Sequence, residues 1–119
     1  MRAFNVTVFD GWVTSTVQVY SDATLNELLG RADEVVVQVF ADDSDGTDPK
    51  LDVELWYSND NVNWDSKAQV VNDLAVSAVP VTTLVTVGAG LGGFVRFGLA
   101  MAAASTKARV KLIIVGRYL

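Results

Sequence analysis

The sequence predicts an all-β protein, an antiparallel two-sheet β-sandwich of about eight or nine strands, of jelly-roll or discoidin-like type. Short runs in which apolar and polar residues alternate recur along the whole chain, and Gly, Asp, Asn and Ser separate them. Half of the 119 residues are apolar and 19% are charged, as expected for a globular protein with one core. No linker, repeat or low-complexity tract divides the chain, so we expect a single domain over residues 1–119.

The first half of the chain predicts four strands and one helix. Two amino-terminal runs provide inward-facing sets. A short helix follows near residues 23–30, with a capping box at Thr24 and Glu27 and Gly30 at its end. Strands then cover residues 34–41, apolar on both faces and therefore central, and 50–58. The inward-facing sets are Phe4, Val6 and Val8, then Val13, Val17 and Val19, and in the fourth strand Leu51, Val53, Leu55 and Tyr57.

The second half predicts five more runs, over residues 66–71, 74–79, 81–87, 94–102 and 108–118. The last run is unusual because Ile113 and Val115 make its second half apolar on both faces. Another surface should therefore cover that half. The expected core residues of the last two runs are Val95, Phe97, Leu99 and Met101, then Val110, Leu112 and Ile114.

Composition excludes several classes of function. The chain has no Cys and no His, which rules out disulfides, thiolate or imidazole metal sites and His-dependent catalytic triads. The net charge of −5 argues against nucleic-acid binding. Few positioned carboxylates remain for a small hydrolase, so we expect no enzyme and no catalytic residue.

Charge is divided along the chain. All 14 acidic residues lie at or before Asp73, whereas residues 94–119 hold five bases and no acid. Two interpretations are open: pairing between neighbouring strands of one monomer, or complementary patches on adjacent copies.

The sequence also bears on localisation. Residues 74–95 carry no charge and are long enough to span a bilayer, but Pro80, several glycines and period-two alternation favour strands over a membrane helix. Residues 1–20 contain no apolar core of a signal peptide. We therefore expect no membrane insertion, and a virion or cytoplasmic assembly as the location.

Two loops resemble ligand-binding motifs. The acidic run 42–48 offers Asp43, Asp45 and Asp48 as oxygen ligands for Ca²⁺, with a solvated turn as the alternative. No other cofactor is expected. Glycines 88, 90 and 93 match G-x-G-x-x-G, but a strand pattern rather than a helix follows, so we predict a hairpin or interface loop and no dinucleotide site.

Aromatic residues indicate a contact surface. By alternation Trp12, Tyr20 and Trp56 lie opposite the core-facing residues of their strands. Exposed aromatics are typical of protein interfaces and of sugar-stacking platforms. We predict an interface formed by Trp12, Tyr20, Trp56, Ile113 and Val115.

A family resemblance covers about half of the chain. Residues 36–64, with the acidic turn, the Leu-Asp-Val-Glu-Leu-Trp-Tyr strand and Ser58-Asn59-Asp60-Asn61-Val62-Asn63-Trp64, resemble the strand, turn, strand and S-x-D-G-x-x-W pattern of small β-sandwich proteins in phage and prophage structural modules. Residues 94–97 and 111–117 are similar to their closing strand pair. Asn61 replaces the usual glycine at the left-handed position of a tight turn, and Trp64 would cap the sandwich edge. The resemblance implies a small capsid, decoration or tail-associated protein.

Two functional hypotheses follow. The first is a non-enzymatic, self-assembling or decorating subunit of a virion or virus-like particle, whose partners are copies of itself or another particle subunit. The second is a carbohydrate- or calcium-dependent binding module that uses the exposed aromatics for a glycan.

Overall fold

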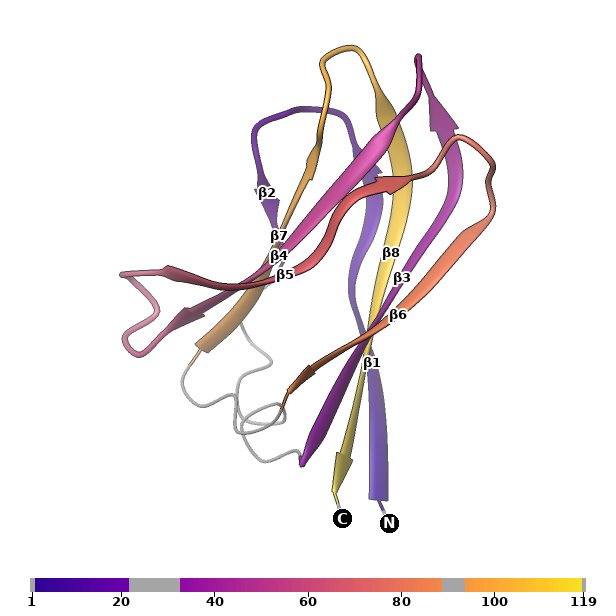
Figure 1. Cartoon of the computed structure of the whole chain (residues 1–119). Helices are drawn as coiled ribbons and strands as arrows, with labels where there is room; N and C mark the ends of the chain where they lie inside the picture. Colours follow the sequence, from indigo (N-terminus) through magenta and orange to yellow (C-terminus); the bar gives the residue numbers. More distant parts are fainter. Residues whose placement is uncertain (1, 22–32, 89–93, 119) are drawn as a thin grey trace.

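The computed structural model describes residues 2–21, 33–88 and 94–118, which form two four-stranded antiparallel sheets. In Figure 1 the order β1-β8-β3-β6 makes one sheet and β2-β7-β4-β5 the other. The strands are β1 (Arg2–Val13), β2 (Val19–Tyr20), β3 (Glu34–Asp45), β4 (Lys50–Ser58), β5 (Asp65–Ala75), β6 (Val81–Gly88), β7 (Phe94–Met101) and β8 (Lys107–Tyr118). The predicted all-β, two-sheet class is therefore confirmed.

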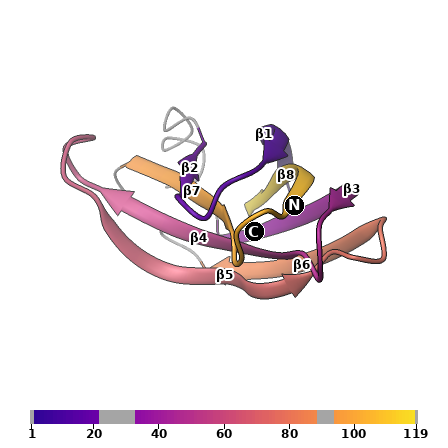
Figure 2. The same ribbon diagram turned by 90° about the horizontal axis from the view of Figure 1, so that it is seen from above.

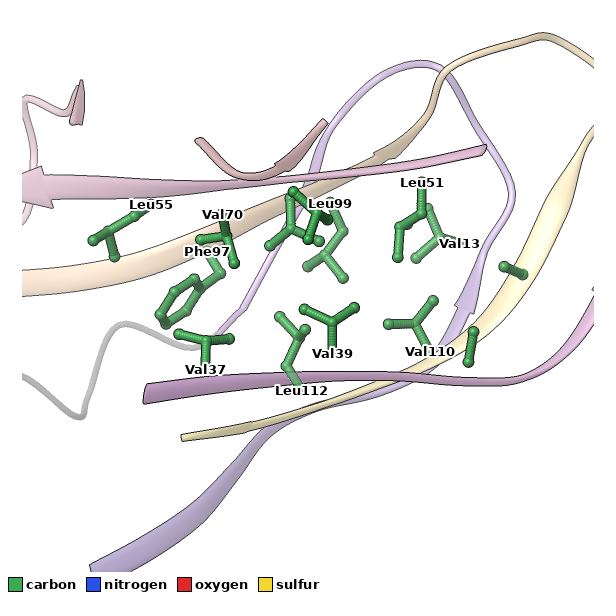
Figure 3. Packing of buried hydrophobic residues seen from close by; sticks show 14 of the residues in the cluster. Val13, Val37, Val39, Leu51, Leu55, Val70, Phe97, Leu99, Val110 and Leu112 are labelled. Carbon is green, nitrogen blue, oxygen red and sulfur yellow. The ribbon is translucent and has the colours of Figure 1, made fainter. Parts of the chain in front are cut away.

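The core lies between the inner faces of the two sheets. Seen from above, β1, β8 and β3 lie on one side and β2, β7 and β4 on the other (Figure 2). Figure 3 shows side chains from both layers meeting between them, and the largest fully buried ones are Phe97, Leu51, Leu55, Leu99, Met101 and Leu112. Each fully buried apolar side chain of this kind contributes roughly 1.5–3 kcal/mol to the free energy of unfolding.

The alternation predicted for β4, β7 and β8 is confirmed. Every second residue of β4 from Leu51 to Leu55 is fully buried, and Tyr57 packs against the core from a partly buried position. The expected core sets of β7 and β8 are also buried. Val35 and Val37 are fully buried in β3, which lies between β8 and β6 as predicted for a strand apolar on both faces.

The second predicted set of core residues, Val13, Val17 and Val19, is wrong at two of its three positions. Val13 is buried, but Val17 and Val19 are 73% and 39% exposed. The reason is that β2 is only two residues long and lies at the edge of its sheet, so little of the chain covers it.

The strand expected over residues 74–79 is wrong beyond Ala75. Run 66–71 extends into β5, which continues through a bulge at the polar pair 72–73 and ends at Ala75, and residues 76–79 form no strand. Asp73 adopts a φ of 53° there, and its N–H donates to the Asp52 carboxylate at 2.8 Å. The bulge keeps the strand paired with β4 on both sides. The helix expected near residues 23–30 lies outside the described residues.

The first and last strands are neighbours. β1 and β8 pair antiparallel along their whole length, from Arg2 opposite Tyr118 to Val13 opposite Ala108. Figure 1 shows the two chain ends side by side at one end of the sandwich. Among the residues that the structure describes, no helix is long and apolar enough to cross a membrane.

Candidate functional site

The outer surface of the β1-β8-β3-β6 sheet carries a line of apolar side chains, which we call the apolar face: Val36, Phe40, Leu84, Ile113 and Val115. Backbone register sets them in adjacent rows, because Ile113 pairs with Gln38, which pairs with Leu84, while Val115 pairs with Val36. Leu84 is 66% exposed, and the other four are half-buried by their neighbours in the sheet. The covering surface that the sequence predicts for Ile113 and Val115 is not supplied by any described strand of this chain.

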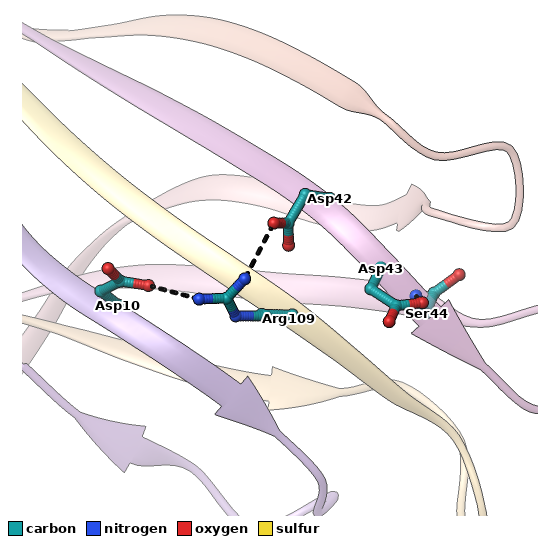
Figure 4. A network of polar contacts seen from close by, with 5 residues as sticks. All are labelled: Asp10, Asp42, Asp43, Ser44 and Arg109. Carbon is teal, nitrogen blue, oxygen red and sulfur yellow. Dashed lines mark hydrogen bonds and ion pairs between the residues drawn. The ribbon is translucent and has the colours of Figure 1, made fainter.

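Ion pairs mark both ends of the apolar face. At one end Arg109 lies between two acids, with its guanidinium nitrogens 3.1 Å from Asp42 and 4.0 Å from Asp10 (Figure 4). At the other end Arg117 lies 3.0 Å from Glu34. These pairs form because the basic strand β8 lies between β1, which carries Asp10, and the acidic strand β3. Pairing within the monomer, one of the two interpretations of the charge division, therefore occurs at both arginines.

Trp12 lies on this same sheet, opposite Arg109 in the register of β1 and β8. Its side chain is 41% exposed, and the Lys107 ammonium lies 4.9 Å from the ring centroid. Trp12 therefore belongs to the charged end of the apolar face.

The opposite outer surface carries a different group, the arginine–aromatic cluster, formed by Tyr20, Trp56, Trp64 and Arg96. The Arg96 guanidinium carbon lies 3.8 Å from the Tyr20 ring centroid and 4.2 Å from that of Trp64. Both distances are within the range of a cation–π contact, so the cation contacts both rings. Tyr20 also meets Trp56 edge to face, with centroids 6.0 Å apart.

Gly98 makes room for this cluster. It lies between Tyr20 and Glu54 in the sheet register, and a Cβ there would come within 2.7 Å of Gln18 Oε1 and 3.0 Å of Trp56 Nε1. The Gln18 amide lies over this gap and donates to Glu54 at 2.9 Å. An alanine would push both side chains outward.

Two N–H donors in the cluster are buried without a partner. Trp56 Nε1 and Arg96 Nε make no hydrogen bond to any residue that the structure describes. Buried donors are normally satisfied, and each unpaired one costs about 1–3 kcal/mol. The cluster therefore contains two N–H donors whose hydrogen-bonding capacity is unused by the described residues.

A tight turn presents Trp64 to the cluster. The Asp60 carboxylate accepts hydrogen bonds from the backbone of Val62 and Asn63 at 2.9 and 2.8 Å, and from the side chains of Asn63 and Ser58. These bonds, the backbone ones first, hold the pKa of Asp60 well below its usual value. Asn61 has a φ of 60°, so the left-handed turn predicted there is confirmed.

The acidic run is not one free loop. Asp43 and Asp45 belong to β3 and pair with β8, and each carboxylate accepts a bond from the next backbone N–H, of Ser44 and of Gly46. Asp48 pairs with Lys50 at 3.6 Å. Within the described part of the chain, no three carboxylates come together to hold a metal. Calcium binding at this turn stays a prediction. Most of the glycine loop lies outside the described residues.

The structure separates the predicted interface residues into two sets. Trp12, Ile113 and Val115 lie on one sheet, while Tyr20 and Trp56 lie on the other. Sequence reasoning missed Arg96 and the place of Trp64, because their meeting depends on the pairing of β4 with β7. Leu84 and Phe40 were also missed, although alternation in their runs could have placed them outward.

No family model matches the sequence, and no curated protein matches it. Solved structures share the fold. The VP2 subviral particle of infectious bursal disease virus matches with a TM-score of 0.55 and 7% identity, over 98% of this chain and 32% of that chain. The Gx strain of the same virus matches with a TM-score of 0.50 and 6% identity, over 99% and 33%.

The N-terminal CBM22-1 and GH10 modules of Clostridium thermocellum endo-1,4-β-D-xylanase 10B, complexed with xylohexaose, match with a TM-score of 0.54 and 11% identity, over 98% of this chain and 26% of that chain. This chain therefore spans about a third or less of the chains that it matches. At these identities the likeness shows a common β-sandwich fold, found both in a viral particle protein and in a xylanase.

Proposed function

We propose that the protein is a non-catalytic structural subunit of a virion or virus-like particle, and that it associates with copies of itself through the apolar face. The carrying observation is the row of Val36, Ile113 and Val115 on the two central strands, with Leu84 66% exposed beside them. Gln38 lies between Ile113 and Leu84 in their row, and the apolar side chains around it form a partly exposed patch, which is typical of a protein contact.

A second copy fits this face by charge as well as by hydropathy. Consider a two-fold axis parallel to the strands and midway between β8 and β3. It places β8 of one copy over β3 of the other, with the rows in register. Arg109 then lies over the irregularity at Asp42 and Asp43 of the second copy and Arg117 over Glu34 of the second copy, while Val115 meets Val36. Both charged ends are thus self-complementary, as an isologous interface requires.

The fold is compatible with this role. A β-sandwich of the same arrangement occurs in VP2 of a subviral particle. Packed sheets commonly align within about 30°, which allows the outer faces of two sandwiches to meet.

Light scattering coupled to gel filtration tests the proposal. The wild-type chain should elute as a multiple of 12.8 kDa, and negative-stain imaging should show discrete particles in any large fraction. Ile113→Lys should lower the mass of the assembly without lowering Tm by much. Val62→Lys is the matched control, because Val62 is 74% exposed in the turn before Trp64. Wild-type protein that stays monomeric at high concentration would exclude the proposal.

A second candidate function is saccharide binding by the arginine–aromatic cluster. The specific observation is the Tyr20 ring, which is 43% exposed and meets Trp56 edge to face, with the Gln18 amide and its partner carboxylate of Glu54 in the same cluster. Aromatic rings with a few oriented polar groups are the usual components of a sugar-binding surface.

Tryptophan fluorescence tests this second candidate with neutral and uronic-acid oligosaccharides as separate arms. Binding should shift the emission, and Arg96→Met should weaken it about tenfold or more, the equivalent of 1.4 kcal/mol. Lys107→Met, beside Trp12 on the other sheet, is the control. No response to either arm, with Arg96→Met as stable as wild type, would mean that the cluster only packs the surface.

A further inference from the structure

We propose that β6 is a second contact strand, and that it pairs antiparallel with β6 of another copy to join two four-stranded sheets into one of eight strands. This inference rests on the proposed self-association but uses the edge of the sheet, which shares only Leu84 with the apolar face. The mixing experiment below separates the two contacts, because only edge pairing brings the Leu84 residues of two copies together.

β6 is an unguarded edge strand. Residues 81–87 read Val-Thr-Thr-Leu-Val-Thr-Val, with no charge, no proline and high β-propensity. Exposed edges of this composition invite pairing with another chain, and proteins usually protect them with charges, bulges or short strands.

The other edges carry such protection. β5 has three register shifts against β4 and contains Asp65, Lys67 and Asp73. β1 has a shift between Thr7 and Phe9 and carries Asp10, and β2 is two residues long. The pairing of β6 with β3 is regular from Val81 to Thr86, and its one irregularity lies next to Gly88. β6 thus presents the longest regular edge without a charge among the described strands.

The free side of β6 has unused backbone groups. In an antiparallel edge strand every second residue directs its N–H and C=O away from the sheet. Within the described residues, no backbone hydrogen bond from outside the β3 pairing reaches residues 81–87. A partner strand would satisfy these groups in the way that β-strand addition does.

The sequence of β6 is self-complementary about Leu84. A two-fold axis perpendicular to the sheet at Leu84 places the Leu84 residues of two copies opposite each other. Thr82 then faces Thr86 of the second copy on the outer surface, and Thr83 faces Val85 on the inner one. Threonine pairs and pairs of β-branched residues are favourable cross-strand neighbours. No like charges meet anywhere along the pair.

A mixing experiment on position 84 tests the pairing. Leu84→Lys and Leu84→Glu each place like charges at the axis, so each variant alone should lose edge pairing. An equimolar mixture should restore it, because opposite charges then meet. Face-to-face association cannot give this result, since the two-fold of the apolar face sets Leu84 over Thr7 of the second copy. Val62→Lys with Val62→Glu is the matched control pair and should behave as wild type throughout.

Hydrogen exchange separates the two contacts. In the wild-type assembly the peptide covering 81–87 should exchange at least tenfold more slowly than in Leu84→Lys. Ile113→Lys should retain this slow exchange of residues 81–87 if the substitution disrupts only the contact at the apolar face. Unchanged assembly size and unchanged exchange in Leu84→Lys, or a mixture that does not recover, would overturn edge pairing while leaving the apolar face intact. A wild-type monomer would overturn both.

Discussion

The two outer faces of this sandwich differ in what covers them. On the β2-β7-β4-β5 sheet the protein covers itself, because Tyr20, Trp56 and Trp64 gather around Arg96 over the gap at Gly98. On the β1-β8-β3-β6 sheet the large side chains Trp12, Arg109 and Arg117 lie at the two ends, and Ile113 and Val115 between them are half-buried. The same alternating pattern thus produces one outer face with a packed aromatic cluster and one with partly exposed apolar side chains.

The sharpest way to test this difference is to compare two neighbours in β8. Leu112 is fully buried, whereas Ile113 points to the apolar face. Leu112→Ala should lower the free energy of unfolding by about 2–5 kcal/mol, and Ile113→Ala by less than about 1 kcal/mol. Urea denaturation of dilute protein measures both. Equal losses would mean that Ile113 is part of a covered core.

A substitution at Gly98 should disrupt the packing of the arginine–aromatic cluster on the outer face of the β2-β7-β4-β5 sheet. Gly98→Ala should cost about 1–3 kcal/mol of stability, because the new methyl group displaces Gln18 and Trp56. Gly11→Ala is the matched control, since a Cβ there would meet only Phe9, at 4.0 Å. Thermal unfolding and near-ultraviolet circular dichroism of the tryptophans report the two variants. A Gly98→Ala variant with wild-type thermal unfolding and circular dichroism would show that the cluster does not depend on this close approach.

Reversing the charges of Arg117 and Glu34 tests whether these residues contact a second copy at the end of the apolar face. Arg117→Glu and Glu34→Arg should each weaken association, by about tenfold or 1.4 kcal/mol. Mixing the two variants should restore it, because each then presents to the other the opposite charge at both positions. Analytical ultracentrifugation measures the recovery. If Arg117 and Glu34 act only within one monomer, the mixture will behave as the two separate variants do.

Acid should weaken the turn that presents Trp64. The Asp60 pKa is lowered on folding by its hydrogen bonds, so its contribution is complete above the ordinary carboxyl pKa and is lost as pH falls through the lowered value. Asp60→Asn should therefore lower Tm slightly at pH 7, and the difference from wild type should shrink below about pH 4. Thermal scans across pH test it, with Asp65→Asn in the next strand as the control. A difference that stays constant with pH would contradict this role.

Much of the fold follows from residue periodicity, and the exceptions have local causes. In β4 alternation correctly predicts the buried side chains from Leu51 to Leu55, and in β7 it predicts the core set from Val95 to Met101, although Ala100 between them is buried as well. Both strands are flanked on two sides. The prediction that Val17 faces the core is wrong, because no long strand forms around it. Asn72 and Asp73 look like a turn, but the backbone bond to Asp52 lets the strand continue through a bulge.

The candidate sites were harder to predict, because they depend on which strands are neighbours. Nothing in the order of residues sets Arg96 beside Trp64, since that contact needs the β4–β7 register and the Asp60 turn together. The position of β8 between β1 and β3 likewise decides that the basic tail meets acids of its own chain. The aromatic set appeared as one surface in the sequence and occupies two in the structure.

The pairing of β1 with β8 has a consequence for how the chain can be rearranged. Because Arg2 and Tyr118 are direct partners, a peptide of a few residues could join the ends without disturbing a strand. New ends could then be opened at the exposed turn of Ser77 and Ala78, giving a circular permutant with every strand pairing retained. For the same reason, a foreign polypeptide could be carried at both ends on one side of the sandwich, away from the connection between β5 and β6 (Figure 1).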